Sequence, residues 1–292
     1  MKLINQQAVK TNTTKRLAKN SIYKYIFVAA TSFGLIVLAT LIYRVLTQGL
    51  GYIDLSFFTN FASRHADKAG IKAALVGSLW MMSVVAPVSI ILGVGTALYL
   101  EEYAKKSRFT AFIQTNIQNL AGVPSIVFGL LGLTIFVRTF GLGRSILAGG
   151  LTMSLLILPI IVVASQEAIR SVPREMREAS FGMGATKWQT IRQVVLPAAI
   201  PGILTGAILA LSRAIGETAP LVMIGALTFV AYLPENYLSG FTVMPIQIFN
   251  WTSRPQEEFH YVAAGGIIVL LLMLIIMNSV AVFIRNKFQK RY

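Results

Sequence analysis

The feature that most constrains this chain is the recurrence of apolar stretches long enough to cross a lipid bilayer. A transmembrane helix needs about 20 consecutive, mostly apolar residues. Six segments of the 292-residue chain meet this condition, namely residues 25–46, 73–100, 113–137, 145–165, 200–230 and 262–284. The sequence therefore predicts an all-α integral membrane protein with six transmembrane helices in contact with membrane lipid. The first segment is too long for the apolar region of a signal peptide.

The amino-acid composition excludes several other classes of protein. Apolar residues make up 55% of the chain and charged residues 13%, which leaves too little polar surface to cover a soluble globule of this length. The lack of cysteine excludes disulfides and thiolate chemistry. The two histidines, His65 and His260, fall in expected loops and share no metal-ligand spacing, so we expect no metal site.

Lysine and arginine flank the apolar segments, and their distribution predicts the topology. The net charge of +15 is not gathered on one soluble face, so we expect no nucleic-acid partner. If both termini are cytosolic, the cytosolic segments carry eighteen of these cations and the external segments carry seven. This asymmetry satisfies the positive-inside rule. We therefore expect a multi-pass protein whose amino and carboxyl termini both lie inside (N-in and C-in).

The spans and loops divide the chain into four parts. We expect a cytosolic amino-terminal tail at 1–24, the first transmembrane helix and an external loop at 25–70, a core of five further helices at 71–284, and a basic cytosolic tail at 285–292. The external segments 47–70 and 231–261 are long and contain aromatic, proline and asparagine residues. We expect them to fold into a cap or a docking surface.

The cytosolic segment between the fourth and fifth spans has a helix–turn–helix pattern at about 175–197. Gly182 and Gly184 mark the turn, and apolar residues recur at helical spacing on either side. Pro173 and Pro197 bound the unit. The pattern permits an amphipathic hairpin that lies in the membrane interface, with the glycines as ordinary helix punctuation. It equally permits a coupling element that contacts a cytosolic partner.

The fifth span contains two opposite charges, Arg213 and Glu217, at i, i+4 spacing. A charge near the bilayer centre costs about 3 kcal/mol or more, so each needs a partner. One interpretation is that the two neutralise each other. The other is that Arg213 faces a shared pathway, because a guanidinium fork matches the oxygens of a tetrahedral oxyanion, while Glu217 holds it in place. Gly216 and Pro220 interrupt the helix here, and irregular backbone at membrane depth is tolerated mainly where it lines a cavity or packs on protein.

Two weaker features also have alternative interpretations. A set of glycines and a proline in the third span indicates either a pore-lining bend or close helix packing. These residues are Gly122, Pro124, Gly129 and Gly132. Arg170, at the inner end of the fourth span, lies either near a cytosolic exit of the pathway or acts as a snorkelling interfacial anchor.

The sequence contains no recognisable nucleotide-binding or catalytic motif. No G-x-x-x-x-G-K-[ST] loop occurs, so any ATP must bind to another chain, and we expect no enzymatic activity here. No serine–lysine pair, paired aspartates or H-E-x-x-H lies in the spans, which makes an intramembrane enzyme a remote alternative. A self-contained secondary transporter is disfavoured because the spans show no internal repeat.

The hairpin sequence resembles the EAA loop of ABC importer permeases. The matching residues are Glu178, Ala179, Ser180, Gly184, Leu196 and Pro197. Serine replaces the third motif residue, alanine, and Val194 replaces an isoleucine. Three further stretches, at 120–129, 143–150 and 210–220, are similar to PstA-type permeases of phosphate-specific ABC importers. The similarity runs from about residue 71 to the end of the sixth span.

The resemblance implies a fold, a function and a set of partners. The fold would be that of a type I ABC importer permease in the cytoplasmic (inner) membrane of a bacterium. The function would be ATP-driven import of inorganic phosphate, with a sulfate or molybdate permease as the alternative. The partners would be a PstC-type sister permease, a PstB-type ATPase dimer that uses ATP and Mg²⁺, and an external PstS-type phosphate-binding protein. This chain would bind no cofactor, and its EAA loop would couple to the ATPase.

Overall fold

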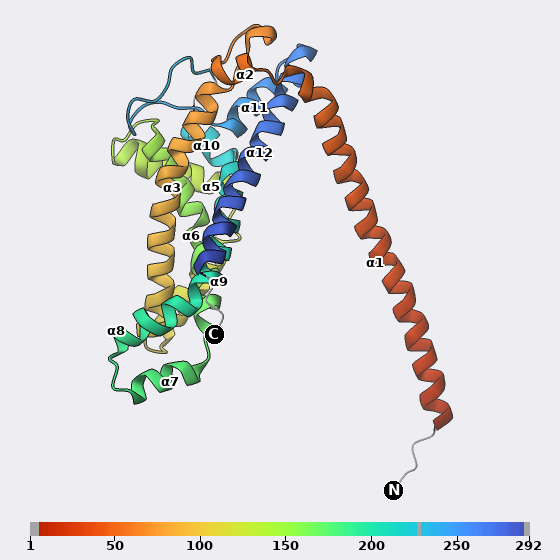
Figure 1. Cartoon of the computed structure of the whole chain (residues 1–292), viewed down its shortest axis with the longest axis vertical. Coiled ribbons are helices and arrows are strands. Elements are labelled where there is room, and N and C mark those ends of the chain that lie inside the picture. Colours follow the sequence, from red (N-terminus) through yellow and green to blue (C-terminus); the bar gives the residue numbers. More distant parts are fainter. Residues whose placement is uncertain (1–5, 227–228, 289–292) are drawn as a thin grey trace.

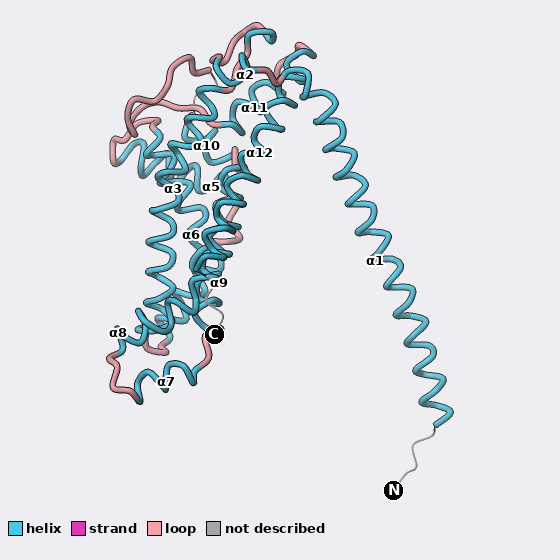
Figure 2. The backbone as a smooth tube through the Cα atoms, viewed as in Figure 1, coloured by secondary structure: helices cyan, strands magenta, loops and turns pink. Residues whose placement is uncertain are grey.

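The computed structural model describes residues 6–226 and 229–288, and helices account for nearly all of its regular structure (Figure 1). Figure 2 shows most of the loops gathered at the two ends of the helical bundle. Five helices are long and apolar enough to cross a membrane, and a bent pair of helices supplies a sixth crossing if it is counted as one span. The prediction of an all-helical protein with several spans is therefore confirmed.

The helix α6 (Ile146–Arg170) occupies the centre of the bundle. On either side it packs against α3 (Lys72–Leu98) and α9 (Leu196–Gly216). Buried apolar side chains from all three helices form the main core, including Met81, Val85, Met153, Ile157, Ile161 and Ala210. The spans are therefore ordered around α6 by apolar packing along its length.

Two glycines allow α3 to approach α6 closely. A Cβ atom on Gly93 would lie 2.6 Å from Cγ2 of Ile161, and one on Gly150 would lie 2.7 Å from Cβ of Val84. Real Cβ atoms do not come so near, so any larger residue at either position would force the helices apart. Small residues at such contacts are the usual means of packing helices in membranes.

The third predicted span is not one straight helix. The segment predicted at 113–137 forms α4 (Arg108–Leu120) and α5 (Ser125–Gly132), which continues as the π-helical segment η4 (Leu133–Thr139), and the two parts meet at an angle of 104°. Pro124 causes the break, because it lacks an N–H and disfavours helical backbone in the residue before it. Its own backbone is extended.

The glycines of this segment serve two purposes. Gly122 lies in the turn between α4 and α5, at the bend that one of the two interpretations predicted. By contrast, Gly129 packs against α10 (Ala219–Ile224), where a Cβ atom would lie 2.8 Å from Cα of Pro220. Gly132 packs in the same way against Thr152 of α6. The structure therefore shows a bend beside Gly122 and close packing at the other two glycines, and a pore-lining role for the bend stays a prediction.

The fifth span begins and ends earlier than the predicted 200–230. One apolar helix of 30 residues runs from Lys187 to Gly216 through α8 (Lys187–Thr190), the π-helical η5 (Ile191–Val195) and α9. It stops before Glu217, whose backbone is extended, and α10 follows as a separate short helix. Hydropathy alone merges α9 with α10 because both are apolar.

Pro197 does not end the cytosolic hairpin, contrary to the prediction. It lies in the first turn of α9, directly after the π-helical η5, within the continuous helix. A proline lacks the N–H that an α-helix interior requires, and it is tolerated where the hydrogen-bond ladder changes from one pattern to another. The second arm of the hairpin and the fifth span are therefore one helix.

The first helix, α1 (Gln6–Gly49), is longer than the predicted span 25–46 and includes most of the predicted amino-terminal tail. Figure 1 shows that it leaves the bundle and meets α12 (Glu257–Phe288) only near its carboxyl end. None of its most apolar stretch is buried by the rest of the chain. The free ends of α1 and α12 both point toward the end of the molecule that carries α8, in keeping with termini on one side of the membrane (Figure 1).

The two long segments at the opposite end form a folded cap, as predicted. They contain α2 (Leu55–Thr59) and α11 (Met244–Thr252), and the rings of Phe57 and Trp251 pack 6.0 Å apart in a buried cluster. The Ser56 hydroxyl and the Phe57 N–H donate to the carboxylate of Asp54, which caps α2 and whose pKa is lowered by these bonds. A docking role for this cap remains a prediction.

The crossing of α1 and α12 generates a test of how α1 is held. A Cβ atom on Gly49 would lie 2.6 Å from backbone atoms of Ala264 and Gly265, whereas Gly34, on the same helix, has open space around it. We expect Gly49→Leu to destabilise the purified full-length chain in detergent by about 1–3 kcal/mol through overpacking, as measured by thermal unfolding. Gly34→Leu is the matched control and should leave stability nearly unchanged. Equal stability of the two variants would contradict the crossing.

Candidate functional site

The turn of the cytosolic hairpin depends on Gly184. The first arm is α7 (Arg174–Gly182), and the chain then reverses through Gly184, whose φ is +82°. The Gly184 N–H donates to the carbonyl of Phe181 at 2.9 Å, and the Ala185 N–H donates to the carbonyl of Ser180 at 3.2 Å. These two bonds form a Schellman motif, in which a left-handed residue ends the helix. Glycine fits this position because it has no Cβ atom.

The second arm begins with a capping box that was not predicted from the sequence. The Gln189 N–H donates to Oγ1 of Thr186 at 3.4 Å, and the Thr186 N–H donates to Oε1 of Gln189 at 2.8 Å. The signal was present in the sequence, because a threonine followed three residues later by glutamine is a known helix-start pattern.

The departure from the EAA motif at Ser180 has a structural role. Its hydroxyl lies 2.9 Å from the hydroxyl of Thr190, so the two arms share a hydrogen bond. Alanine at this position could not form it. The serine therefore joins the two arms near the turn, next to the buried Thr190.

Three large apolar side chains are exposed around the turn of the hairpin. Met183, beside the turn, is 89% exposed, and Phe181 and Trp188 on the two arms are also exposed. Large apolar side chains gathered on an exposed element are typical of a protein or membrane contact surface. The geometry therefore supports an element that meets another molecule.

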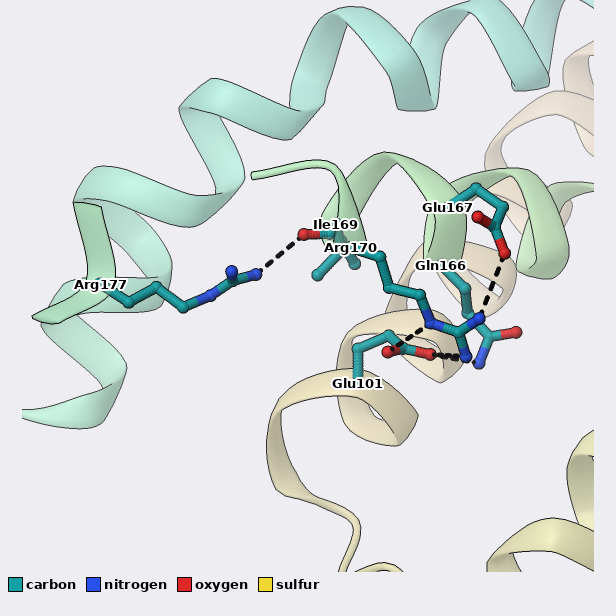
Figure 3. A network of polar contacts seen from close by, with 6 residues as sticks. All are labelled: Glu101, Gln166, Glu167, Ile169, Arg170 and Arg177. Carbon is teal, nitrogen blue, oxygen red and sulfur yellow. Dashed lines mark hydrogen bonds and ion pairs between the residues drawn. The ribbon is translucent and has the colours of Figure 1, made fainter. Parts of the chain in front are cut away.

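Arg177 joins the hairpin to two spans. Its guanidinium donates to the carbonyls of Ile169 and Val172, at 2.8 and 2.6 Å, where the carboxyl end of α6 leaves carbonyls without helical partners. It also pairs with Glu102 at 3.2 Å, in the π-helical segment η3 (Tyr99–Tyr103) that extends α3. Figure 3 shows Arg177 reaching across to Ile169. Movement of the hairpin is therefore mechanically tied to α6 and α3.

Arg170 lies beside this junction, in a second set of charged contacts. It binds both carboxylate oxygens of Glu101, at 2.7 and 2.9 Å, and contacts Glu167 at 3.2 Å, while Gln166 donates to Glu101 at 2.8 Å (Figure 3). Bidentate pairs of this kind fix geometry as well as charge. Arg170 thus cross-links α6 to η3, a role that neither of its sequence interpretations contained.

Arg213 and Glu217 pair as their spacing predicted. Nε of Arg213 lies 3.1 Å from Oε1 of Glu217, with side chains 48% and 19% exposed. Glu217 stands just past the end of α9, in the extended link to α10. Since a helix rises about 1.5 Å per residue, this pair and the hairpin turn lie roughly 40 Å apart at opposite ends of one helix. The residues singled out from the sequence therefore occupy two separate places.

Comparison with known proteins identifies the family. Residues 89–292 match the family described as "Binding-protein-dependent transport system inner membrane component". The chain belongs to this family. It is accordingly a multi-pass membrane component of a transport system, and the prediction from the EAA loop is confirmed at this level.

Several relatives within the family are similar over much of the chain. The "Probable ABC transporter permease protein YqgI" of Bacillus subtilis (strain 168) is 38% identical over 66% of this chain, which spans 65% of that protein. The "Phosphate transport system permease protein PstA 1" of Mycobacterium tuberculosis (strain CDC 1551 / Oshkosh) is 38% identical, with 73% of this chain and 71% of that protein covered. The "Phosphate transport system permease protein PstA" of Xylella fastidiosa (strain Temecula1 / ATCC 700964) is 32% identical over 88% and 90% of the two chains.

Solved structures confirm the fold. A chain of a bacterial ABC transporter involved in the import of alginate superposes with a TM-score of 0.67 at 15% identity, covering 96% of this chain and all of that one. A chain of the inward-facing MetNI methionine ABC transporter superposes with a TM-score of 0.61 at 17% identity, covering 73% and 94%. The chain therefore has the fold of ABC importer permeases, as the resemblance implied.

The hairpin turn generates a test with a control two residues away. Gly184→Ala should destabilise the hairpin by about 1–2 kcal/mol, because alanine resists the left-handed backbone. A Cβ atom on Gly182 meets nothing within 4 Å and its φ is ordinary, so Gly182→Ala should be neutral or slightly stabilising. Hydrogen exchange at the backbone amides of position 184 and of Ala185 measures the effect directly. Equal exchange in both variants would show that the Schellman motif does not determine the turn.

Proposed function

We propose that this chain is a permease subunit of an ATP-driven ABC importer that moves inorganic phosphate into the cell. The observation that carries the proposal is the EAA-type hairpin, whose arms are closed by Ser180 and which Arg177 fastens to two spans. The names of the relatives in Mycobacterium and Xylella support phosphate as the cargo. A sulfate or molybdate permease is the alternative, because those oxyanions share the tetrahedral shape.

The hairpin is the proposed contact with a cytosolic ATPase dimer. Its exposed apolar side chains, with Met183 at the turn, suit a contact in which a partner removes them from water. A displacement there would pass through Arg177 and Glu102 to α6 and α3, and through the continuous helix from Lys187 to α9. ATP and Mg²⁺ would bind in the ATPase, and this chain would contribute gating without covalent chemistry. The proposal places this end of the molecule, and both termini, in the cytosol.

Two further partners complete the proposed importer. A homologous PstC-type permease would supply the other half of the pathway, and a PstS-type phosphate-binding protein would deliver the anion to the outer cap. The solved alginate transporter was crystallised in complex with a periplasmic protein bound to an alginate pentasaccharide. That complex supports an external binding protein as the partner of the cap, although the cargo of the alginate transporter is a polysaccharide.

Arg213 is the proposed anion contact. Its Nε is bonded to Glu217, while its two Nη atoms have no hydrogen-bond partner within residues 6–226 and 229–288. Those remaining donors form the side of the fork that can face a phosphate oxygen. Glu217 would then position Arg213 and limit how tightly the site holds the anion.

Reconstitution tests the function as a whole. Liposomes that contain this chain, the sister permease, the ATPase dimer and the binding protein should accumulate labelled phosphate when ATP is supplied on the ATPase side. Omission of this chain should abolish uptake, and sulfate or molybdate should not compete. Uptake of sulfate or molybdate in preference to phosphate would reject phosphate as the cargo. ATP hydrolysis by this chain alone would reject the permease role.

A double-mutant cycle tests the role of Arg213. If it contacts the anion, Arg213→Gln should nearly abolish uptake by the assembled complex, and Arg213→Lys should restore only part of it, because a point charge lacks the fork. If the pair is only scaffold, the single change should reduce assembly by leaving Glu217 without its partner. The double variant that combines Arg213→Gln with Glu217→Gln distinguishes the pathway role from the scaffold role. Normal assembly without uptake supports the pathway role, whereas recovered uptake contradicts it.

A further inference from the structure

A cavity of about 1150 Å³ opens beside the hairpin, at the end of the molecule proposed to be cytosolic. Its walls come from η3, the loop after it, α4, the end of α6 and α7. The roles proposed for the hairpin and for Arg213 leave this space unexplained. Six cations line it. Besides Arg170 and Arg177, whose ion pairs are described above, they are Lys105, Lys106, Arg108 and Arg174.

The charges around the cavity do not balance. Of the three glutamates in its walls, Glu101 is engaged by Arg170 and Glu102 by Arg177, which leaves Glu178. Among the described residues, none of the other four cations, at positions 105, 106, 108 and 174, forms an ion pair with a carboxylate. Four such cations and only one unengaged carboxylate around one cavity create a net positive potential that attracts an anion.

The residue pattern of α4 suits a helix at the edge of the membrane. α4 is amphipathic, and it contributes Ala111 and Gln114 to the cavity wall. Its aromatic residues Phe109 and Phe112 do not line the cavity and are 71% and 64% exposed. A short helix with exposed aromatic residues on one side and polar residues on the other is suited to lie in the boundary between headgroups and acyl chains. Tyr99, in η3 at the end of the α3 span, is also exposed, as in the aromatic belts of membrane proteins.

We propose that this cavity binds the phosphate-bearing headgroup of an anionic phospholipid from the cytosolic leaflet. Basic pockets between transmembrane helices on the cytoplasmic side bind such headgroups, and the exposed aromatics of α4 would lie along the acyl chains. Because Lys105 follows η3 and Arg174 begins α7, the lipid bridges the loop after α3 to the hairpin. The proposal rests on the cytosolic orientation given above, but binding is measured without transport, so the two can fail separately.

The test uses a fluorescent short-chain phosphatidylglycerol and the full-length chain in neutral detergent, with binding followed by fluorescence anisotropy. Lys105→Gln combined with Arg174→Gln removes two lining charges and should weaken binding by about tenfold or more. Lys19→Gln combined with Lys24→Gln removes the same charge from α1, outside the cavity, and should change binding less than about twofold. Equal losses in the two double variants would mean that net charge alone attracts the lipid, and would overturn the site.

Competition distinguishes the possible occupants. Unlabelled phosphatidylglycerol should displace the probe, whereas phosphatidylcholine and inorganic phosphate should not. Displacement by inorganic phosphate at matched concentration would show that the cavity binds free phosphate, and would overturn the proposal of a lipid site. Binding should also persist in the complex assembled with the ATPase dimer. Its loss there would show that protein covers the cavity, and would overturn the lipid site.

Two variants of a single residue keep the test usable if the double variant misfolds. If the double cavity variant elutes as an aggregate, Lys106→Gln and Lys106→Arg replace it, since both keep a long side chain at the cavity wall. The glutamine variant should bind the probe more weakly than the arginine variant. Equal binding by these two variants contradicts the proposal.

Discussion

The bilayer interior offers no water to satisfy a polar group, and the rest of this structure depends on that constraint. Several buried hydroxyls on the spans bond to their own helices: Ser89 donates to the Val85 carbonyl at 2.6 Å, and Thr152 donates to the Ala148 carbonyl at 2.8 Å. Charges that cannot do so are paired, as Arg213 is with Glu217. The remaining polar chemistry is displaced to the ends of the helices, where the hairpin and its arginines lie.

The hairpin is joined to the bundle by two different kinds of connection. Its first arm is attached by side chains, because Arg177 binds the exposed carbonyls of α6 and a carboxylate of η3. Its second arm is attached by the backbone, because the helix from Lys187 to Gly216 is continuous. A push on the first arm therefore reaches the centre of the bundle, while a push on the second reaches the link at Glu217. Such rigid connections are what hinge and shear motions of packed helices require.

Much of the fold follows from the sequence, and the failures have physical causes. The spans and the hairpin could be predicted because hydropathy and the EAA-type residues are local signals. The bend at Pro124 and the stop at Gly216 were merged into longer spans because hydropathy averages across a break flanked by apolar helices. The pairing of Arg170 with Glu101 joins residues far apart in the chain, so only the packing of α6 against α3 reveals it. By contrast, the capping box at Thr186 was a local signal that was overlooked.

The length of α1 has a consequence for what surrounds the chain. Its 44 residues extend about 66 Å at 1.5 Å per residue, whereas the hydrocarbon layer is only about 30 Å thick. Tilting absorbs part of the excess, but a large part of the helix must still stand in headgroups and water. Because its apolar stretch is untouched by the bundle, that stretch is solvated by lipid or by another protein. The helix thus stands away from the transport core over most of its length and is joined to it at the Gly49 crossing.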